Sequence, residues 1–410
     1  MKISLPLSLI SAAILSSGIA QAQQDKFAYA VTDVNKDGAS WSFLRKLDLS
    51  TGAFSDVLLN GNDATQMAFD ASSKKQMTVP LKDDRYGTAA NAAFGTGVAA
   101  IAYDKKNKRI YYTPMLLDQL RYIDLKTMKV FFVNGGGLTG LKIKVTDQSN
   151  IVTRMAIASD GFGYALTNDG NHLVRFSTGK NAQSIDMGAL VDDPANKDVS
   201  VHNSCTSYGG DMIADDDGNL YVFSARNQVF RVNIQSKVAT HLGAVNGLPT
   251  AFTINGAAVD DNNQILFSSA VDNSSLYTLN YQTMTASPSK SGPWRSSDLA
   301  NSNLLATRNA LPSVRDLRNP DEIADGRIQL FPNPVTNKQF TVQFGLSEGN
   351  YTVQVLDIAG RQAAQSFINI RGKGQTENIQ LPQSAKTGVY LVKVVDKNNA
   401  VMFSKKVVVQ

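Results

Sequence analysis

Hydrophobic and polar residues alternate in short runs along most of the chain, and turn-forming residues separate the runs. Alternation with a period of two is typical of strands that are half buried in a sheet. From residue 98 onward one pattern recurs: an apolar strand that ends in Asp, a short turn, an aromatic-rich strand, and a further strand that ends in Asp, Asn or Ser. We therefore expect an all-β repeat protein.

Four copies of this pattern align on the Asp that ends the first strand. These residues, Asp104, Asp160, Asp215 and Asp260, lie 56, 55 and 45 positions apart. Within each copy the marker that ends the third strand follows the first marker by 17 to 20 residues. The spacing within a copy is nearly constant while the spacing between copies varies. The insertions therefore fall in the loop that connects one copy to the next.

The two ends of the repeat region each hold part of a copy. Residues 27–31 and 44–48 resemble the later strands of a copy, and residues 297–300 match the opening strand at 211–214. Pairing these ends completes a blade and removes exposed sheet edges, as a closed β-propeller requires. We predict a β-propeller with five detectable blades, in which residues 58–95 are either a long insertion or a sixth, eroded blade. An open sandwich or a β-solenoid is the alternative.

Composition supports a chain of strands and turns. Residues 23–326 contain 30 Asp and one Glu, and Asp favours turns whereas Glu favours helix interiors. The formal net charge is +5, yet residues 327–410 carry ten basic and four acidic residues, against 29 and 31 in residues 23–326. Because the basic excess lies at one end and no basic stripe is interleaved with aromatic residues, we expect no nucleic-acid partner.

The N-terminus has the pattern of an export signal. Lys2 precedes an apolar run at residues 5–19, and residues 20–22 (Ala-Gln-Ala) give the small-x-small pattern of a signal-peptidase site. The run is shorter than the roughly 20 apolar residues of a membrane span. We predict a signal peptide over residues 1–22 and a mature chain that begins at Gln23.

A second domain is expected at the C-terminus. Residues 308–326 are polar and charged, and we predict that they link a propeller passenger domain at 23–307 to a small domain at 327–410. Seven short alternating runs in the small domain fit an immunoglobulin-like β-sandwich. An ordinary adhesive sandwich would account for the strands alone.

Four motifs follow one another in this small domain. They are Phe331-Pro332-Asn333-Pro334, Asp357-Ile358-Ala359-Gly360-Arg361, Gly388-Val389-Tyr390-Leu391-Val392-Lys393-Val394 and Lys405-Lys406-Val407-Val408-Val409. Together they resemble the C-terminal sorting domain of the type IX (Por) secretion system of Bacteroidetes. The residues that carry the sorting motifs are Pro332, Asn333, Pro334, Gly360, Gly388, Tyr390, Lys405 and Lys406.

The resemblance implies a route and partners. The signal peptide would direct passage across the inner membrane, and recognition of the sorting domain would direct passage across the outer membrane. The implied partners are the type IX secretion machinery and a peptidase that cleaves off the sorting domain. The passenger is then released, or is attached to an anionic surface polysaccharide, so that the protein is secreted or displayed on the outer-membrane cell surface.

The propeller region offers one candidate metal site. Asp33, Asn35 and Asp37 place side-chain oxygen atoms at alternate positions before Gly38, as in the first half of a calcium loop. Leu44 stands where such a loop has a bidentate Glu. Calcium is therefore the cofactor that we consider, and a hairpin turn without metal is the alternative.

Motifs for catalysis are weak. His172, His202 and His241 have no zinc-site spacing, and Cys205 lies near His202 without a marked carboxylate. The chain contains no nucleophile elbow, P-loop or dinucleotide fingerprint. We expect a binding or interaction protein with an unknown extracellular ligand and no chemistry of its own. The alternatives are a propeller hydrolase or lyase acting on extracellular polysaccharide or peptide, and a structural envelope component.

Overall fold

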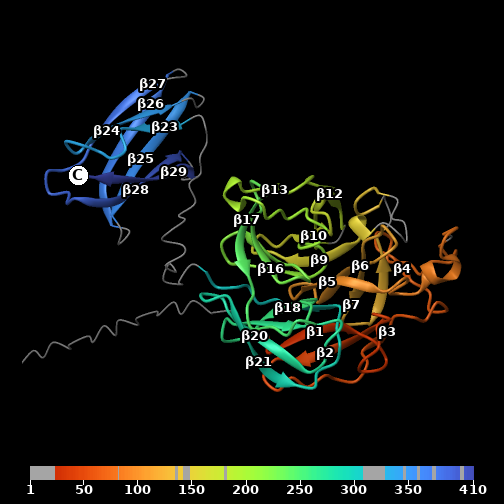
Figure 1. Cartoon of the computed structure of the whole chain (residues 1–410). Helices are drawn as coiled ribbons and strands as arrows, with labels where there is room; N and C mark the ends of the chain where they lie inside the picture. The colour runs from red at the N-terminus through yellow and green to blue at the C-terminus, as the bar shows by residue number, and fades with distance from the viewer. Residues whose placement is uncertain are drawn as a thin grey trace, which may run out of the picture. The chain divides into compact units, whose positions relative to one another are not determined.

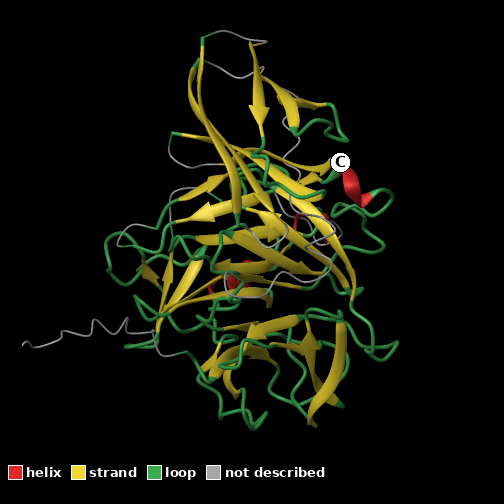
Figure 2. Cartoon of the chain, turned by 90° about the vertical axis from the view of Figure 1, so that its left-hand side faces the viewer, coloured by secondary structure: helices red, strands yellow, loops and turns green. Residues whose placement is uncertain are grey.

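The computed structural model describes residues 24–81, 83–133, 137–141, 148–179, 182–307, 328–344, 348–357, 361–371, 375–397 and 401–410. The chain divides into two compact units, Met1–Asn309 and Ala310–Gln410. Regular structure in the described residues is almost all strand, with three short 3-10 turns (Figure 2). None of their helices is long and apolar enough to cross a membrane. The predicted signal peptide and linker lie outside the described residues.

The described part of the first unit forms five sheets. In each sheet the four inner strands run outward as an antiparallel meander, and in two sheets a fifth strand pairs in parallel at the outer edge. Blade 1 contains β22 (Asp298–Ala300), β1 (Phe27–Thr32), β2 (Phe43–Asp48) and β3 (Leu59–Asn60). Blade 2 contains β5 (Val98–Asp104), β6 (Arg109–Pro114), β7 (Arg121–Asp124) and β8 (Lys129–Phe132), with β4 (Phe69–Asp70) parallel to β8 at the outer edge.

The other three blades repeat this arrangement. Blade 3 contains β9 (Val152–Ile157), β10 (Gly163–Thr167), β11 (Leu173–Phe176) and β12 (Ser184–Asp186). Blade 4 contains β14 (Asp211–Ala214), β15 (Asn219–Phe223), β16 (Gln228–Asn233) and β17 (Val238–Ala244), with β13 (Val191–Asp192) outermost. Blade 5 contains β18 (Gly256–Val259), β19 (Ile265–Ser268), β20 (Ser275–Asn280) and β21 (Thr285–Ser291). The 3-10 turns η1 (Gly87–Asn91), η2 (Gln148–Asn150) and η3 (Pro194–Asn196) lie in the connections.

The five innermost strands close into a ring. Each contacts the next in the order β22, β5, β9, β14 and β18, and β18 contacts β22 again. Figure 1 labels β5, β9 and β18 among these strands. Strand β22, from the end of the unit, pairs with β1, from its start, with Ala30 opposite Leu299. The predicted β-propeller and its closure by the two chain ends are confirmed. Residues 58–95 contain only β3, β4 and η1 among their described residues, so they are an insertion and the sixth-blade alternative was wrong.

Aromatic side chains of the repeat fill the space between blades. The ring centroids of Tyr29 and Tyr103, from blades 1 and 2, lie 5.0 Å apart. Phe223 and Phe267, from blades 4 and 5, are also 5.0 Å apart. Aromatic residues bury large areas in edge-to-face pairs, which explains why the strands of each copy are rich in Tyr and Phe.

The repeated Asp and Asn residues form the turns that follow the strands. The Oδ1 atom of Asp215 accepts hydrogen bonds of 2.8 Å from the N–H groups of Asp217 and Asn219. Similar turns recur after the first or third strand of the blades, at Asp48, Asp104, Asp124, Asp160, Asn233, Asp260 and Asn280. Such turns need few residues because the side chain replaces a backbone partner. They lie on the face of the ring where the innermost strands end, which we call the strand-end face; the opposite face is the strand-start face.

Residues 301–307, which we call the tail, cross the strand-end face. The N–H of Leu305 donates to the carbonyl of Ala214 at 3.0 Å, and the N–H of Asp216 donates to the carbonyl of Leu305 at 3.1 Å. The side-chain amide of Asn263 exchanges two hydrogen bonds with the backbone of Ala306. The tail is thereby held to blades 4 and 5.

The first described residues are held to the same face. The buried carboxylate of Asp25 accepts hydrogen bonds from the N–H and hydroxyl of Ser302 and lies 2.8 Å from the Lys105 ammonium. The side chain of Asn303 exchanges two hydrogen bonds with the backbone of Asp25. Both ends of the propeller are therefore tied together beyond the pairing of β22 with β1.

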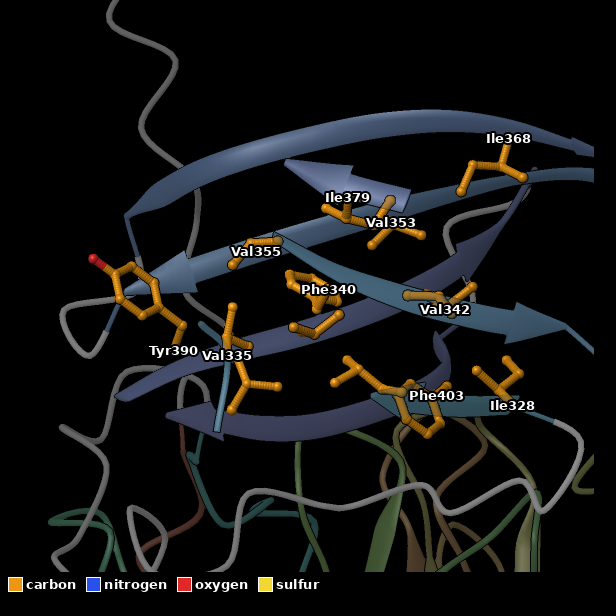
Figure 3. Close-up of a cluster of buried hydrophobic side chains, with 14 of the residues drawn as sticks. Ile328, Val335, Phe340, Val342, Val353, Val355, Ile368, Ile379, Tyr390 and Phe403 are labelled. Atoms are coloured by element: carbon orange, nitrogen blue, oxygen red, sulfur yellow. The ribbon is translucent and has the colours of Figure 1, made fainter. Parts of the chain in front are cut away.

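The second unit is a sandwich of two antiparallel sheets. One sheet contains β23 (Ile328–Phe331), β24 (Gln339–Phe344) and β27 (Gln375–Gln380). The other contains β26 (Gln362–Ile370), β25 (Gly349–Asp357), β28 (Gly388–Asp396) and β29 (Val401–Val409). Side chains such as Phe340, Val353 and Val355 form the core between them (Figure 3). The seven predicted strands and the immunoglobulin-like sandwich are confirmed.

Candidate binding face and sorting domain

Loop lengths differ between the two faces of the propeller. Short turns follow the innermost strands on the strand-end face, at residues 105–108, 158–162, 215–218 and 260–264. Longer connections join successive blades on the strand-start face. Their described residues are 61–68, 71–81, 83–97, 133, 137–141, 148–151, 187–190, 193–210, 245–255 and 292–297. Binding residues are found disproportionately on loops that a rigid scaffold positions. The strand-start face is therefore the candidate binding face.

Three charged side chains are fully buried near the start of the innermost strands. They are Arg154 of β9, Asp211 of β14 and Asp298 of β22. Burial raises the pKa of both carboxyls well above the usual range, and the charge of Asp211 raises the pKa of Asp298 further. Burial lowers the pKa of Arg154 to about 10. Because none of the three is exposed, they do not contact a ligand on the surface of this face.

Sequence reasoning did not identify these buried charges. A usable signal was present, since an Asp immediately precedes an apolar innermost strand both at Asp211 and at Asp298. We used that match to align the strands. It also marks a repeated carboxylate at the same end of two innermost strands.

Asp33, Asn35 and Asp37 lie in the loop between β1 and β2 on the strand-start face. The Asp33 carboxylate accepts hydrogen bonds from the N–H groups of Val34 (2.5 Å), Asn35 (3.2 Å) and Ser40 (2.6 Å). Asn35 and Asp37 are exposed. Both oxygen atoms of Asp33 thus stabilise their own loop, and the part of the chain that the structure describes holds no group of three or more His, Cys, Asp or Glu suited to a metal. Calcium binding at this loop stays a prediction.

The connection between blades 5 and 1 is tied to this loop. The Arg295 guanidinium donates to the carbonyl of Asp37 at 2.7 Å, and the backbone N–H of Arg295 donates to the carbonyl of Lys36 at 3.0 Å. The neighbouring Trp294 ring stacks on the guanidinium of Arg45, 3.9 Å from its ring centroid. Trp294 therefore packs within the protein, and the two loops form one continuous surface.

Two apolar side chains are exposed on this part of the strand-start face. Val34 is 52% exposed in the loop between β1 and β2, and Val271 is 48% exposed in the loop between β19 and β20. Both loops contact the connection at residues 292–297, because Arg295 bonds to the first loop and Gly292 donates to the carbonyl of Ser274 in the second. Exposed apolar groups beside polar backbone suit contact with another molecule.

A small cavity lies beside blade 2, between the insertion and strand β8. Its volume is about 260 Å³, and polar and apolar groups share its lining: Gln66, Met67, Ala68, Phe69, Gln76, Asn91, Ala93, Lys129 and Val130. It is near the lower end of the size of small-molecule sites. It belongs to the edge of the propeller and lies apart from the loop between β1 and β2.

His202 and Cys205 lie in the connection between blades 3 and 4. The Nδ1 atom of His202 is 2.5 Å from the carbonyl oxygen of Asp169, and its Nε2 atom is 3.2 Å from that of Leu190. Cys205 is exposed. Backbone carbonyls therefore hold the imidazole at both nitrogen atoms, and this contact gives His202 a structural role.

The other two histidines belong to separate settings. His172 lies 2.6 Å from the Asp186 carboxylate, and both side chains are partly exposed. The Nε2 atom of His241, on β17, lies 2.8 Å from the Gln228 side chain. The structure does not bring the three histidines into one cluster within the described residues.

In the second unit, Asn333 joins the first motif to the last one. Its side-chain amide donates to the carbonyl of Lys406 at 3.0 Å and accepts a hydrogen bond from the N–H of Val408 at 3.0 Å. Val335 continues this contact as a short parallel bridge to Val409. The side chain of Asn333 thus makes the hydrogen bonds at the end of β29 that the backbone of a neighbouring strand would make. Pro332 and Pro334 flank Asn333 and restrict the backbone on both sides of it.

The remaining sorting residues have different environments. Tyr390 is buried, and its hydroxyl donates to the carbonyl of Lys386 at 2.9 Å. Gly388 opens β28 with φ of 155°. Lys405 and Lys406 are partly exposed on β29. Gly360 lies outside the described residues.

The sorting motifs agree with a family match. Residues 329–410 match the family described as secretion system C-terminal sorting domain. This unit is therefore a sorting domain of the type IX (Por) secretion system, and the protein is exported to the cell surface or secreted. None of the curated proteins matches the chain.

Solved structures with similar folds were also found. PorZ, a surface component of the type IX secretion system of Porphyromonas gingivalis, is 14% identical with a TM-score of 0.32, covering 93% of this chain and 51% of PorZ. This chain thus spans about half the length of PorZ. A streptogramin B lyase is 13% identical with a TM-score of 0.35, covering 64% of this chain and 87% of the lyase. Virginiamycin B lyase from Staphylococcus aureus is 12% identical with a TM-score of 0.30, covering 76% of this chain and 84% of the lyase.

The TM-scores of these likenesses lie below 0.5, so the fold is assigned from the ring of five sheets. The function is inferred from the loops of the strand-start face and from the sorting domain. The molecule is an exported five-bladed β-propeller followed by a type IX secretion system C-terminal sorting domain.

Proposed function

We propose that this exported protein binds an extracellular ligand through the strand-start face of its propeller and does no chemistry of its own. The observation that carries the proposal is the difference between the faces. Short turns and the tail cover the strand-end face, whereas the long connections lie on the strand-start face. A rigid ring that positions several long loops together suits recognition of a glycan, peptide or protein.

The side chains on this face support binding over catalysis. Both nitrogen atoms of His202 contact backbone carbonyls. The Asp33 carboxylate bonds to its own loop, and Asp211 and Asp298 are buried. General acid and base groups must reach a substrate, and none of these four side chains is placed to do so.

The test uses the full chain and a panel of oligosaccharides and peptides. Arrayed ligands should give saturable binding, and Val34→Asp with Val271→Asp should weaken that binding. Phe162→Asp is the matched control, because Phe162 is an exposed apolar residue in a turn on the strand-end face. Equal loss in the control contradicts the assignment of the face.

The same panel separates the alternatives. Turnover of a bound oligosaccharide or peptide supports a hydrolase or lyase. A folded protein that binds nothing in the panel and co-purifies with envelope proteins supports a structural component. Calcium and a chelator in the same assays test the Asp33 loop, where calcium-dependent binding lost in Asp33→Asn would support a metal there.

We further propose that both ends of the chain are removed during export. The sorting domain indicates interaction with the type IX secretion machinery. The sequence predicts cleavage before Gln23, the family resemblance implies removal of the sorting domain, and we place that second cleavage in the linker at residues 308–326. Mass spectrometry of the exported protein should find these termini. A mass larger than that of the polypeptide would support attachment to surface polysaccharide, and a mass equal to it would support release.

A further inference from the structure

The innermost strands leave one edge of each sheet directed to the centre of the ring. Strands β22, β5, β9, β14 and β18 each pair with one neighbour in the described sheets. Backbone N–H groups on the other edges therefore need acceptors from elsewhere. In the propeller, side-chain carboxylates accept some of these hydrogen bonds.

Asp211 accepts hydrogen bonds across two blades. One carboxylate oxygen accepts from the N–H of Met212 at 2.6 Å, and the other accepts from the N–H of Ala257 on β18 at 2.5 Å. The N–H of Leu299 on β22 also favours the ionised form of this carboxylate, and so does the charge of Arg154. Asp211 is therefore a buried carboxylate with several donors around it.

Asp298 has far fewer donors. Its Oδ2 atom accepts a hydrogen bond of 3.2 Å from the N–H of Ile101 on β5. Its Oδ1 atom is buried and has no hydrogen-bond partner among the described residues. The side chain is 0% exposed. A buried oxygen without a donor is strongly unfavourable unless something fills the place beside it.

The charges around this oxygen do not balance. The positive charge of Arg154 acts on Asp211 and Asp169, whereas the charge that acts on Asp298 is the negative charge of Asp211. The Arg154 guanidinium is itself occupied with backbone carbonyls of Ser207 and Gly209. One further positive charge beside Asp298 would neutralise the group.

We propose that Asp298, supported by Asp211, binds a hard metal cation inside the ring. Carboxylate oxygen is the preferred ligand of Na⁺, K⁺ and Ca²⁺, and a monovalent ion already balances the charge. The site differs from the Asp33 loop, which lies in a surface connection. The role of the ion is structural: it joins β22, the strand that closes the ring, to its neighbours.

Thermal unfolding of the full chain tests this site. Trp41 and Trp294 are the two tryptophans of the sequence, and both belong to the propeller, so their fluorescence reports its unfolding alone. NaCl, KCl and CaCl₂ are compared with choline chloride at equal ionic strength after chelator treatment. At a hundredfold excess over the dissociation constant, the binding ion should raise the melting temperature by about 5–10 °C.

Two variants make the test specific. Asp298→Asn keeps the acceptor for Ile101 and removes the charge, so it should abolish the response to the ion and raise the melting temperature in choline. Asp33→Asn should keep the full response. Elemental mass spectrometry should count about one Ca²⁺, or one Rb⁺ as a substitute for K⁺, per wild-type chain.

Several outcomes overturn the proposal. Equal melting temperatures in choline and in each metal salt would overturn it, and so would a full response to the ion in Asp298→Asn. A response to acid without any response to metal would show that a proton neutralises Asp298 instead. If Asp298→Asn does not fold, the metal count on the wild-type chain decides, and a count of zero rejects the site.

Discussion

The propeller and the sorting domain differ in how the end strands of their sheets are paired. In the propeller the first and last strands pair with each other, and the innermost strands form a closed ring. In the sorting domain β23, β27, β26 and β29 are end strands of two open sheets. Asn333 and Val335 cover only the last part of β29. The first unit therefore joins its two chain ends into a ring of sheets, whereas the second unit leaves the end strands of open sheets available to a partner.

Exposed apolar side chains are also placed differently in the two units. In the sorting domain Phe367 is 82% exposed on β26, and the cross-strand pair Val389 and Val408 is also exposed. In the propeller, Val34 and Val271 are exposed in loops, and Ile185 and Val191 are exposed on the outermost strands β12 and β13. The sorting domain therefore offers apolar groups on its strands, whereas the propeller offers them in its connections and on its outermost strands.

The largest effect should come from removing a buried charge of the closed unit. Arg154→Met leaves the carbonyls of Ser207 and Gly209 without donors and Asp211 without a positive neighbour. We expect a loss of about 3–5 kcal/mol in the free energy of unfolding, measured by urea denaturation with tryptophan fluorescence. The control Arg175→Met removes a half-buried arginine that stacks on Phe162, and its loss should not exceed about 1 kcal/mol. Equal losses would contradict the assignment.

The closing strand should be the next most sensitive element. Leu299 on β22 is buried in a cluster with Ala30 and Leu266 from blades 1 and 5. Leu299→Ala should lower the free energy of unfolding of the propeller by about 2–4 kcal/mol because it leaves a cavity at the closure. Leu58→Ala, at a partly exposed position, should change it by less than about 0.5 kcal/mol. An unchanged free energy of unfolding in Leu299→Ala would show that the closing strand does not stabilise the propeller.

A smaller effect is expected in the open unit. Asn333→Ala removes both hydrogen bonds to β29 and should lower the stability of that strand end by about 1–2 kcal/mol. Hydrogen exchange at the N–H of Val408 should then be roughly tenfold faster. Asn369→Ala is the control, since its side chain bonds to the exposed Asn350. Unchanged exchange at Val408 would show that the amide does not protect this edge.

The smallest effect should come from a surface loop of the propeller. Burial opposes ionisation of Asp33, but hydrogen bonds from the side chain and N–H of Ser40 and from the N–H groups of Asn35 and Val34 outweigh it and lower the pKa of Asp33. A carboxyl whose pKa is lower in the folded state stabilises the protein above its unfolded pKa of about 3.9, and this contribution disappears as the pH falls through the folded pKa. Asp33→Asn should therefore cost about 0.5–1 kcal/mol at neutral pH and nothing in strong acid. Urea denaturation across pH measures this, and a constant difference would refute it.

Much of the fold followed from the sequence because both units repeat simple patterns. The Asp markers and aromatic strands located the first three strands of the blades, and the match between residues 297–300 and 211–214 located the closure. The outermost strands were not predicted. Strand β12 is wholly exposed and β21 is mostly exposed, so neither has an apolar run to mark it.

The candidate site was less predictable than the fold. The Asp33 pattern indicated a metal loop, yet its carboxylate bonds to neighbouring N–H groups that no residue type reveals. Asp298 was visible only as part of a strand match, because its hydrogen-bond donor, the N–H of Ile101, lies on β5, almost 200 residues earlier in the chain. The link between Asn333 and β29 likewise joins residues that only the sandwich brings together.

The path of the tail sets where any tether begins. Its last described residue, Thr307, bonds to Asp216 on the strand-end face, so the described part of the propeller ends there. An attachment made further along the chain therefore begins from the face opposite the long connections.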